Sequence, residues 1–236
     1  MKRIGIIIMV LLPLFSPAQQ EKVLNYQEID MKPFHFGYTL GVNTMDFAIY
    51  ASERAASRKD TFPEINKLSP GVDIGIVTNF RISKYLDFRI LPGISLGQRN
   101  LLYYESTDTS WESHSEMKLG STFINLPFNI RYEAERIYNY RPYIIGGINF
   151  RWDMARNKDF NADEGIFIKL EPFDVYYEAG FGVDFYLTYF KLSVELKYSV
   201  GNFNVLSADK HDRYPGYVDS VNELKSRMFS VSFHFE

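Results

Sequence analysis

The 236-residue sequence contains no cysteine. A disulfide framework, a thiolate metal site and a lipid-modified N-terminal cysteine are therefore excluded. The sequence also lacks an excess of charge of one sign, because 26 lysines and arginines stand against 29 aspartates and glutamates, for a net charge of −3. Nucleic-acid-binding surfaces depend on an excess of basic charge, so we expect no nucleic-acid partner.

Long apolar runs are missing after the N-terminal region. No later stretch approaches the roughly 20 consecutive apolar residues that a bilayer-crossing helix needs, which excludes helical membrane spans. Inside a bilayer every backbone N–H and C=O group must be hydrogen-bonded within the protein. If this chain crosses a membrane, it must therefore do so as a closed β-barrel.

The N-terminus has the layout of a secretory signal. Basic residues 2–3 precede an apolar run over residues 4–15, and small residues follow as far as Ala18. A membrane anchor would also be apolar, but this run is short for a spanning helix. We predict a signal peptide over residues 1–18, cleaved after Ala18, and a periplasmic N-terminal segment over residues 19–33.

Aromatic residues are abundant, with 20 Phe and 17 Tyr, and many recur with a period of two. In the first such stretch, Phe34, Phe36 and Tyr38 alternate with His35 and Gly37. Alternate residues of a β-strand lie on opposite faces, so this period predicts strands with one apolar face and one small or polar face. The eight predicted strands cover residues 34–49, 71–81, 86–99, 121–132, 141–153, 175–186, 190–199 and 227–236.

The links between these strands alternate between short and long. In an antiparallel sheet this places every short turn at one end and every long loop at the other, as in outer-membrane barrels. We predict an all-β fold over residues 34–236: an eight-stranded antiparallel transmembrane up-and-down β-barrel with short periplasmic turns and long extracellular loops. The long loops are expected near residues 50–70, 100–120, 154–174 and 200–226.

Alternation alone does not tell a membrane barrel from a soluble lipocalin-like barrel, because both have one apolar face. Loop asymmetry and strand length favour the membrane, with lipid around the barrel. An eight-stranded barrel is filled by its own side chains, so we predict a plugged polar core and expect no solute channel and no small-molecule substrate. The predicted interior polar cluster consists of Asp73, Asp87, Arg89, Glu178, Asp184, Glu195 and Lys197.

Tyrosines gather around the predicted short turns. Amphipathic rings prefer the membrane interface, so the pattern indicates an aromatic girdle at that end of the barrel. The alternative is that these tyrosines reflect ordinary strand propensity. The predicted girdle consists of Tyr85, Tyr132, Tyr138, Tyr140, Tyr143, Tyr186 and Tyr189.

Candidate chemistry is sparse. His114 lies in the run Ser113-His114-Ser115-Glu116, which suggests a hydrolase, but sequence neighbours rarely form a triad and a solvated loop is the favoured interpretation. Residues 159–165 approach the start of a calcium loop, yet the glycine comes one place late and Leu170 stands where a glutamate is needed. We predict no catalytic residues, no metal site and no cofactor.

Two segments carry a resemblance to a known family. Residues 32–47, KPFHFGYTLGVNTMDF, resemble the opening strand of the PorT family, called SprT in gliding bacteria, and residues 171–185, EPFDVYYEAGFGVDF, resemble its sixth strand. The family consists of outer-membrane barrels of the Bacteroidota type IX secretion system. The resemblance implies a role in exporting proteins with C-terminal sorting domains, partners among other components of that system and, in some species, gliding motility. It implies no catalytic residues.

Other functions stay open at this point. One is a structural or adhesive barrel whose long loops contact surface polymers. A second is a lipid- or peptide-modifying enzyme that uses His114 or His211. A third is a soluble periplasmic ligand-binding barrel, which would bury its apolar face instead of exposing it.

Overall fold

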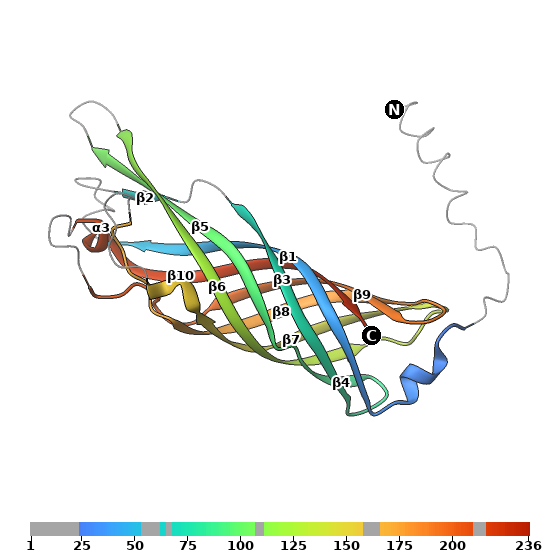
Figure 1. Ribbon diagram of the computed structural model, residues 1–236. Coiled ribbons are helices and arrows are strands. Elements are labelled where there is room, and N and C mark those ends of the chain that lie inside the picture. Colours follow the sequence, from blue (N-terminus) through green and yellow to red (C-terminus); the bar gives the residue numbers. More distant parts are fainter. Residues whose placement is uncertain (1–23, 53–61, 65–67, 107–110, 158–165, 210–215) are drawn as a thin grey trace, which may run out of the picture.

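The computed structural model describes residues 24–52, 62–64, 68–106, 111–157, 166–209 and 216–236 (Figure 1). The described residues form one ten-stranded antiparallel sheet, in which β1 pairs with both β3 and β10 and so closes a ring. The strands are β1 (Phe34–Ala51), β2 (Phe62–Glu64), β3 (Ser69–Arg81), β4 (Leu86–Ile90), β5 (Gly93–Ser106), β6 (Trp111–Glu133), β7 (Tyr140–Asp153), β8 (Phe173–Tyr186), β9 (Lys191–Gly201) and β10 (Val221–Phe235). In the described ranges three short helical turns accompany these strands: η2 (Gln27–Met31), η3 (Met154–Asn157) and α3 (Gly216–Asp219).

The wall has the predicted up-and-down order of eight strands. β4 and β5 are the two halves of one predicted strand and are separated at Pro92, which has no backbone N–H to donate to a ladder. The Pro92 carbonyl still accepts a hydrogen bond from Ile76 at 2.9 Å, so the wall continues across the break. β2 pairs with β5 beyond the part of β5 that pairs with β3, and it joins Phe62 to Tyr104.

One predicted loop is wrong. Most of the region near residues 100–120 is a long hairpin of β5 and β6, paired from Gly93 and Asn125 up to Ser106 and Trp111. Figure 1 shows this hairpin rising well beyond its neighbours. Alternation continues through Leu101, Tyr103, Met117 and Leu119, whose buried side chains hold the hairpin against the end of the barrel. His114 therefore lies in a strand, and its side chain is outside the described part of the chain.

The barrel is apolar outside and polar inside. Phe36 and Ile76 are 67% and 58% exposed, whereas Arg89 and Arg131 are fully buried. A soluble barrel would show the opposite arrangement, so the lipocalin-like alternative is wrong. From Phe34 to Thr44 the outward face of β1 spans about 33 Å of strand, or about 25 Å along the barrel axis at a tilt of about 40°, which matches the apolar band of a membrane barrel.

Polarity reverses towards the long-loop end. Met45 and Phe47 of β1 point inward and are buried, while Asp46 between them lies on the outer face. Beyond this level the interior is an apolar cluster that closes the barrel, and we call it the apolar cap. The apolar cap consists of Phe47, Leu101, Tyr103, Met117, Leu119, Ile166, Phe167, Ile168, Leu170, Val205, Val218, Val221 and Leu224.

A row of phenylalanines crosses the outer wall diagonally. Each ring contacts the next on a neighbouring strand, with centroids 4.9–6.4 Å apart. The row begins at the short-turn end of β1 and reaches the segment that follows β9, because pairing in a tilted barrel is staggered from strand to strand. The row consists of Phe34, Phe80, Phe88, Phe128, Phe150, Phe173 and Phe203.

The end of the barrel opposite the apolar cap carries the three short turns, and η2 lies against this end (Figure 1). None of the helices in the described part of the chain is long and apolar enough to span a membrane.

Candidate functional site: the charged lumen

The seven predicted interior residues occupy inward-facing positions. Asp87, Arg89, Glu178, Asp184 and Glu195 are at most 4% exposed, and the Lys197 side chain is 12% exposed. Asp73 is half-buried and accepts a hydrogen bond from Asn43 Nδ2 at 2.7 Å. The seven side chains face the lumen because alternate residues of each strand point towards the barrel axis.

The layer nearest the short turns centres on Glu236, which follows the closing strand β10. Its Oε1 pairs with Arg89 Nη2 at 2.6 Å, and its Oε2 pairs with Lys191 Nζ at 2.6 Å and His35 Nε2 at 3.3 Å. Arg89 lies on β4 and Lys191 on β9, so one carboxylate joins opposite parts of the ring.

A second group in this layer surrounds Arg131. Its Nη2 pairs with Glu133 at 2.9 Å and with Asp184. Glu133 also accepts a hydrogen bond from Arg141 Nη1 at 2.6 Å. The guanidinium of Arg131 stacks on the ring of Tyr143, 3.7 Å from the centroid.

The middle layer alternates in sign. Lys197 Nζ lies 3.2 Å from Glu178 Oε2 and 3.7 Å from Glu195 Oε1, so it bridges two strands. Glu178 Oε1 also accepts from Arg151 Nη2 at 3.0 Å and from Asn149 Nδ2 at 2.8 Å. A buried charge is tolerated only when it is paired and hydrogen-bonded, and this layer meets that condition.

The upper layer is a single pair below the apolar cap. Arg99 Nη2 lies 2.6 Å from Asp153 Oδ2, and its guanidinium lies over the rings of Phe47 and Phe123, 4.6 and 5.1 Å from their centroids. Asp153 Oδ1 accepts from the backbone N–H of Thr122 and Ala155. This carboxylate thus ends the ladder between β6 and β7.

About half of this network was not predicted from the sequence. The missed residues share the inward parity of the predicted ones, so applying the parity to every strand would have found most of them. They are Arg99, Arg131, Glu133, Arg141, Arg151, Asp153, Asp174, Lys191 and Glu236.

The sequence of this barrel also matches a known protein family. The sequence profile described as "Outer membrane protein beta-barrel domain" matches residues 18–206. The chain belongs to this family. No curated protein sequence matches the chain significantly.

Two solved structures resemble this chain over most of its length, at low sequence identity. Neisserial surface protein A has 9% sequence identity and a TM-score of 0.41, with 86% of this chain and 98% of that chain covered. The N-terminal β-barrel domain of Pseudomonas aeruginosa OprF has 7% identity and a TM-score of 0.30, with 83% and 96% covered.

The tyrosines predicted as a girdle divide into two groups in this outer-membrane barrel domain. Tyr143 and Tyr186 are 3% and 1% exposed inside the barrel, so their assignment to an outward girdle is wrong. Both occupy inward positions of their strands, and Tyr143 donates a hydrogen bond to Glu195 at 3.0 Å. The other five predicted members are exposed or partly buried at the short-turn end, where an interfacial girdle stays a prediction: Tyr85, Tyr132, Tyr138, Tyr140 and Tyr189.

Two of the short turns are linked by side chains. Glu135 accepts hydrogen bonds from the Tyr85 hydroxyl at 2.9 Å and from Lys84 Nζ at 3.2 Å. The hydrogen bond from Tyr85 lowers the pKa of Glu135, and the hydrogen bond from Lys84 lowers it further. Hydrogen bonding to Tyr85 and to Glu135 raises the pKa of Lys84. These side chains are exposed, so the link orients the turns more than it stabilises the barrel.

A polar cavity of about 50 Å³ lies in the middle of the lumen. Thr39, Asn125 and His234 line it, and each has a buried polar atom without a protein partner in the described residues. A buried water needs about 10–15 Å³ and two or more polar partners, so this cavity fits a small water cluster.

The remaining candidate residues fall largely outside the described part of the chain. They include His211, the calcium-like segment 159–165 and the predicted signal peptide. Among the described residues, no group of three or more His, Asp or Glu side chains is placed to hold a metal ion.

Proposed function

We propose that this outer-membrane barrel is a non-enzymatic component of type IX secretion, required for the export of proteins with C-terminal sorting domains and, in gliding species, for motility. In this proposal the signal peptide directs export, the short turns are periplasmic, and the hairpin and apolar cap are extracellular. The proposed barrel conducts no solute through its lumen. The observation that supports this part of the proposal is the filled lumen.

Apart from the small polar cavity, side chains occupy the lumen along its length. Arg89, Arg131 and Glu195 are fully buried, the apolar cap fills one end, and η2 lies across the other. A barrel filled in this way acts through its surfaces instead of conducting solute. The surfaces available to partners are the lipid-facing wall and the two ends.

The resemblance to the PorT family supports the secretion role. The two segments that carry it contain most of β1 and most of β8. These strands supply His35, Asn43, Glu178 and Asp184 to the lumen, so the resembling segments belong to the part of the barrel that organises its interior.

The first experiment compares a deletion strain, its wild-type complement and the parent. Mass spectrometry of the culture supernatant and the cell surface scores proteins with C-terminal sorting domains. We expect these proteins to be lost outside the deletion strain and to accumulate in its periplasm. Unchanged export would refute the secretion role.

The projecting hairpin favours a second candidate, a structural or adhesive barrel. Lys118 and Glu116 form an exposed pair at 3.7 Å on the outer face of the hairpin. Complementation with Glu116→Lys/Lys118→Glu preserves composition and net charge but reverses the charge pattern. If the deletion strain exports normally but the swapped strain loses surface attachment, the adhesive function holds instead.

A further inference from the structure

The segment before β1 is anchored in the short-turn end of the barrel. We call residues 24–33 the N-terminal strap. Within it Ile29 is 2% exposed, whereas the adjacent Glu28 is exposed and Met31 is 80% exposed. The strap therefore inserts the Ile29 side chain into the barrel end and leaves Glu28 and Met31 in solvent.

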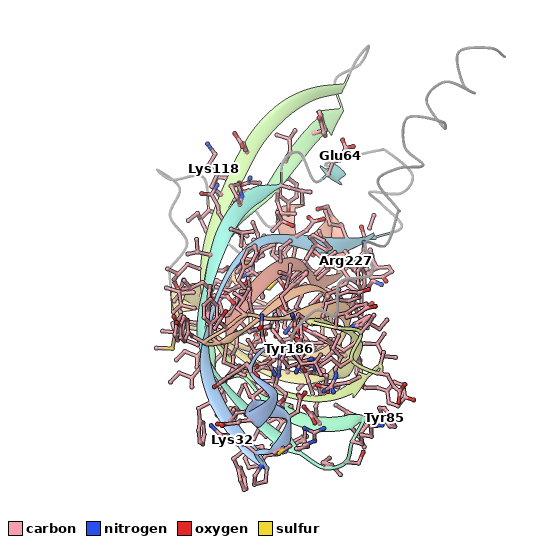
Figure 2. The ribbon with its side chains drawn as sticks, turned by 90° about the vertical axis from the view of Figure 1, so that its right-hand side faces the viewer. Lys32, Glu64, Tyr85, Lys118, Tyr186 and Arg227 are labelled. Carbon is pink, nitrogen blue, oxygen red and sulfur yellow. The ribbon has the colours of Figure 1, made fainter. Side chains whose placement is uncertain are left out.

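Asp30 binds a set of groups that come from three separate parts of the barrel. Its Oδ2 lies 3.3 Å from Arg136 Nη1 in the turn between β6 and β7. Its Oδ1 lies 3.3 Å from Arg141 Nη1 on β7 and accepts a hydrogen bond from the Tyr186 hydroxyl on β8 at 2.9 Å. Figure 2 shows Tyr186 beside η2. Two guanidinium groups and a phenol around one carboxylate form a receptor for that group.

The same receptor holds the strap by its backbone. Arg136 Nη2 donates to the carbonyl of Asn25 at 2.5 Å, and the backbone N–H of Asn25 donates to Asn139 Oδ1 at 2.9 Å. Arg136 is itself fixed by stacking on the ring of Tyr186, 3.7 Å from the centroid. Because these two contacts involve main-chain atoms of Asn25, a peptide with another residue at this place would still form them.

The charges make Asp30 the necessary element. Arg141 has a second carboxylate partner in Glu133, which it shares with Arg131. In the described part of the chain, Asp30 is the only carboxylate within 4 Å of Arg136. The Arg136 side chain is 10% exposed, so without Asp30 a largely buried cation would be left uncompensated.

We propose that the short-turn end carries a carboxylate-binding site, formed by Arg136, Arg141 and Tyr186, in which the chain's own Asp30 is the resident ligand. An acidic peptide of a periplasmic partner takes this site when the strap leaves it. The periplasmic source of the ligand rests on the orientation proposed above; the site itself does not.

The absence of cysteine makes a direct test of the strap possible, because one introduced cysteine is the only thiol. Maleimide labelling of the Ile29→Cys and Met31→Cys variants is compared in the folded full-length barrel in detergent. We expect the thiol of Ile29→Cys to react at least tenfold more slowly than the thiol of Met31→Cys. Adding Asp30→Ala to Ile29→Cys should accelerate its labelling about tenfold or more, while adding Glu28→Ala, which removes a neighbouring exposed carboxylate, should not. Equal rates for the two single-cysteine variants would refute the docking of the strap.

The receptor is tested with a fluorescent peptide of residues 24–33 added to the Asp30→Ala barrel. Fluorescence anisotropy should show at least tenfold tighter binding of this peptide than of the same peptide carrying Asp30→Asn. Adding Arg136→Gln to the barrel should abolish the difference, with heat-dependent gel mobility verifying that the barrel is folded. Equal binding of the two peptides would overturn the site. A normal secretion profile in the deletion strain would overturn the secretion role and leave these binding results unaffected.

Discussion

The Arg99–Asp153 pair gives a quantitative test of the charged lumen. Replacing Arg99 with Met keeps an apolar side chain between the rings of Phe47 and Phe123 but leaves the Asp153 carboxylate, 4% exposed, without its cation. Removing one partner of a buried pair costs about 3–5 kcal/mol. We expect a value near the upper end, because the 2.6 Å contact with Arg99 is the only partner of Asp153 Oδ2 among the described residues.

The double variant Arg99→Met/Asp153→Asn separates charge from packing. It removes the uncompensated carboxylate while retaining an acceptor for the N–H groups of Thr122 and Ala155. We expect the double variant to lose at least about 2 kcal/mol less unfolding free energy than the sum of the losses in the two single variants. Arg227→Met is the matched control, because Arg227 is exposed on the outer face, and it should change stability by less than about 0.5 kcal/mol.

The assay is urea unfolding of the barrel refolded into lipid vesicles, followed by tryptophan fluorescence. If Arg99→Met cost less than about 1 kcal/mol, burial would not be enforcing the pairing. Strict additivity of the two single variants would refute the reasoning equally, because it would mean that the two side chains do not interact.

Three further outcomes are expected. Phe128→Ala removes two ring contacts from the phenylalanine row and should cost about 1–3 kcal/mol more in urea unfolding than Ile124→Ala, which is also outward-facing but lies outside the row; equal costs would show that the row contributes nothing specific. Tyr143→Phe deletes the hydrogen bond to Glu195 and should cost about 1.5–3 kcal/mol, whereas Tyr132→Phe on the outer face should be neutral, and the opposite order would contradict the interior placement. In planar bilayers the purified barrel should give no stable open-channel current, and a steady current would contradict a filled lumen.

The strands and their faces were predictable because one physical rule governs them. Lipid outside and charge inside impose a strict period of two, and that period is written into β1, β8 and β9. The inward position of Tyr186 could have been predicted by the same rule, since Tyr186 lies on the same face of β8 as Glu178 and Asp184. Tyr143 was harder to place, because glycines blur the alternation of β7 and its inward face was not assigned from sequence.

The ends of the barrel were not predictable from periodicity. The apolar cap joins strand residues such as Leu119 to loop residues such as Ile168, and a short apolar run in a loop gives no sign of what it covers. The Asp30 site joins positions more than 100 residues apart in the chain, as in the contacts with Arg136 and Arg141. The polar segment around His114 was interpreted as a loop because strand pairing, which overrides local polarity there, is not visible in the sequence.

The position of Glu236 beside the closing strand has a consequence for assembly. Glu236 is also held to Lys191 on β9 by two backbone hydrogen bonds, so before β10 pairs with β1 it is Arg89 on β4 that lacks its 2.6 Å carboxylate partner. The last strand therefore brings both the missing hydrogen-bond ladder and the missing negative charge, in one step.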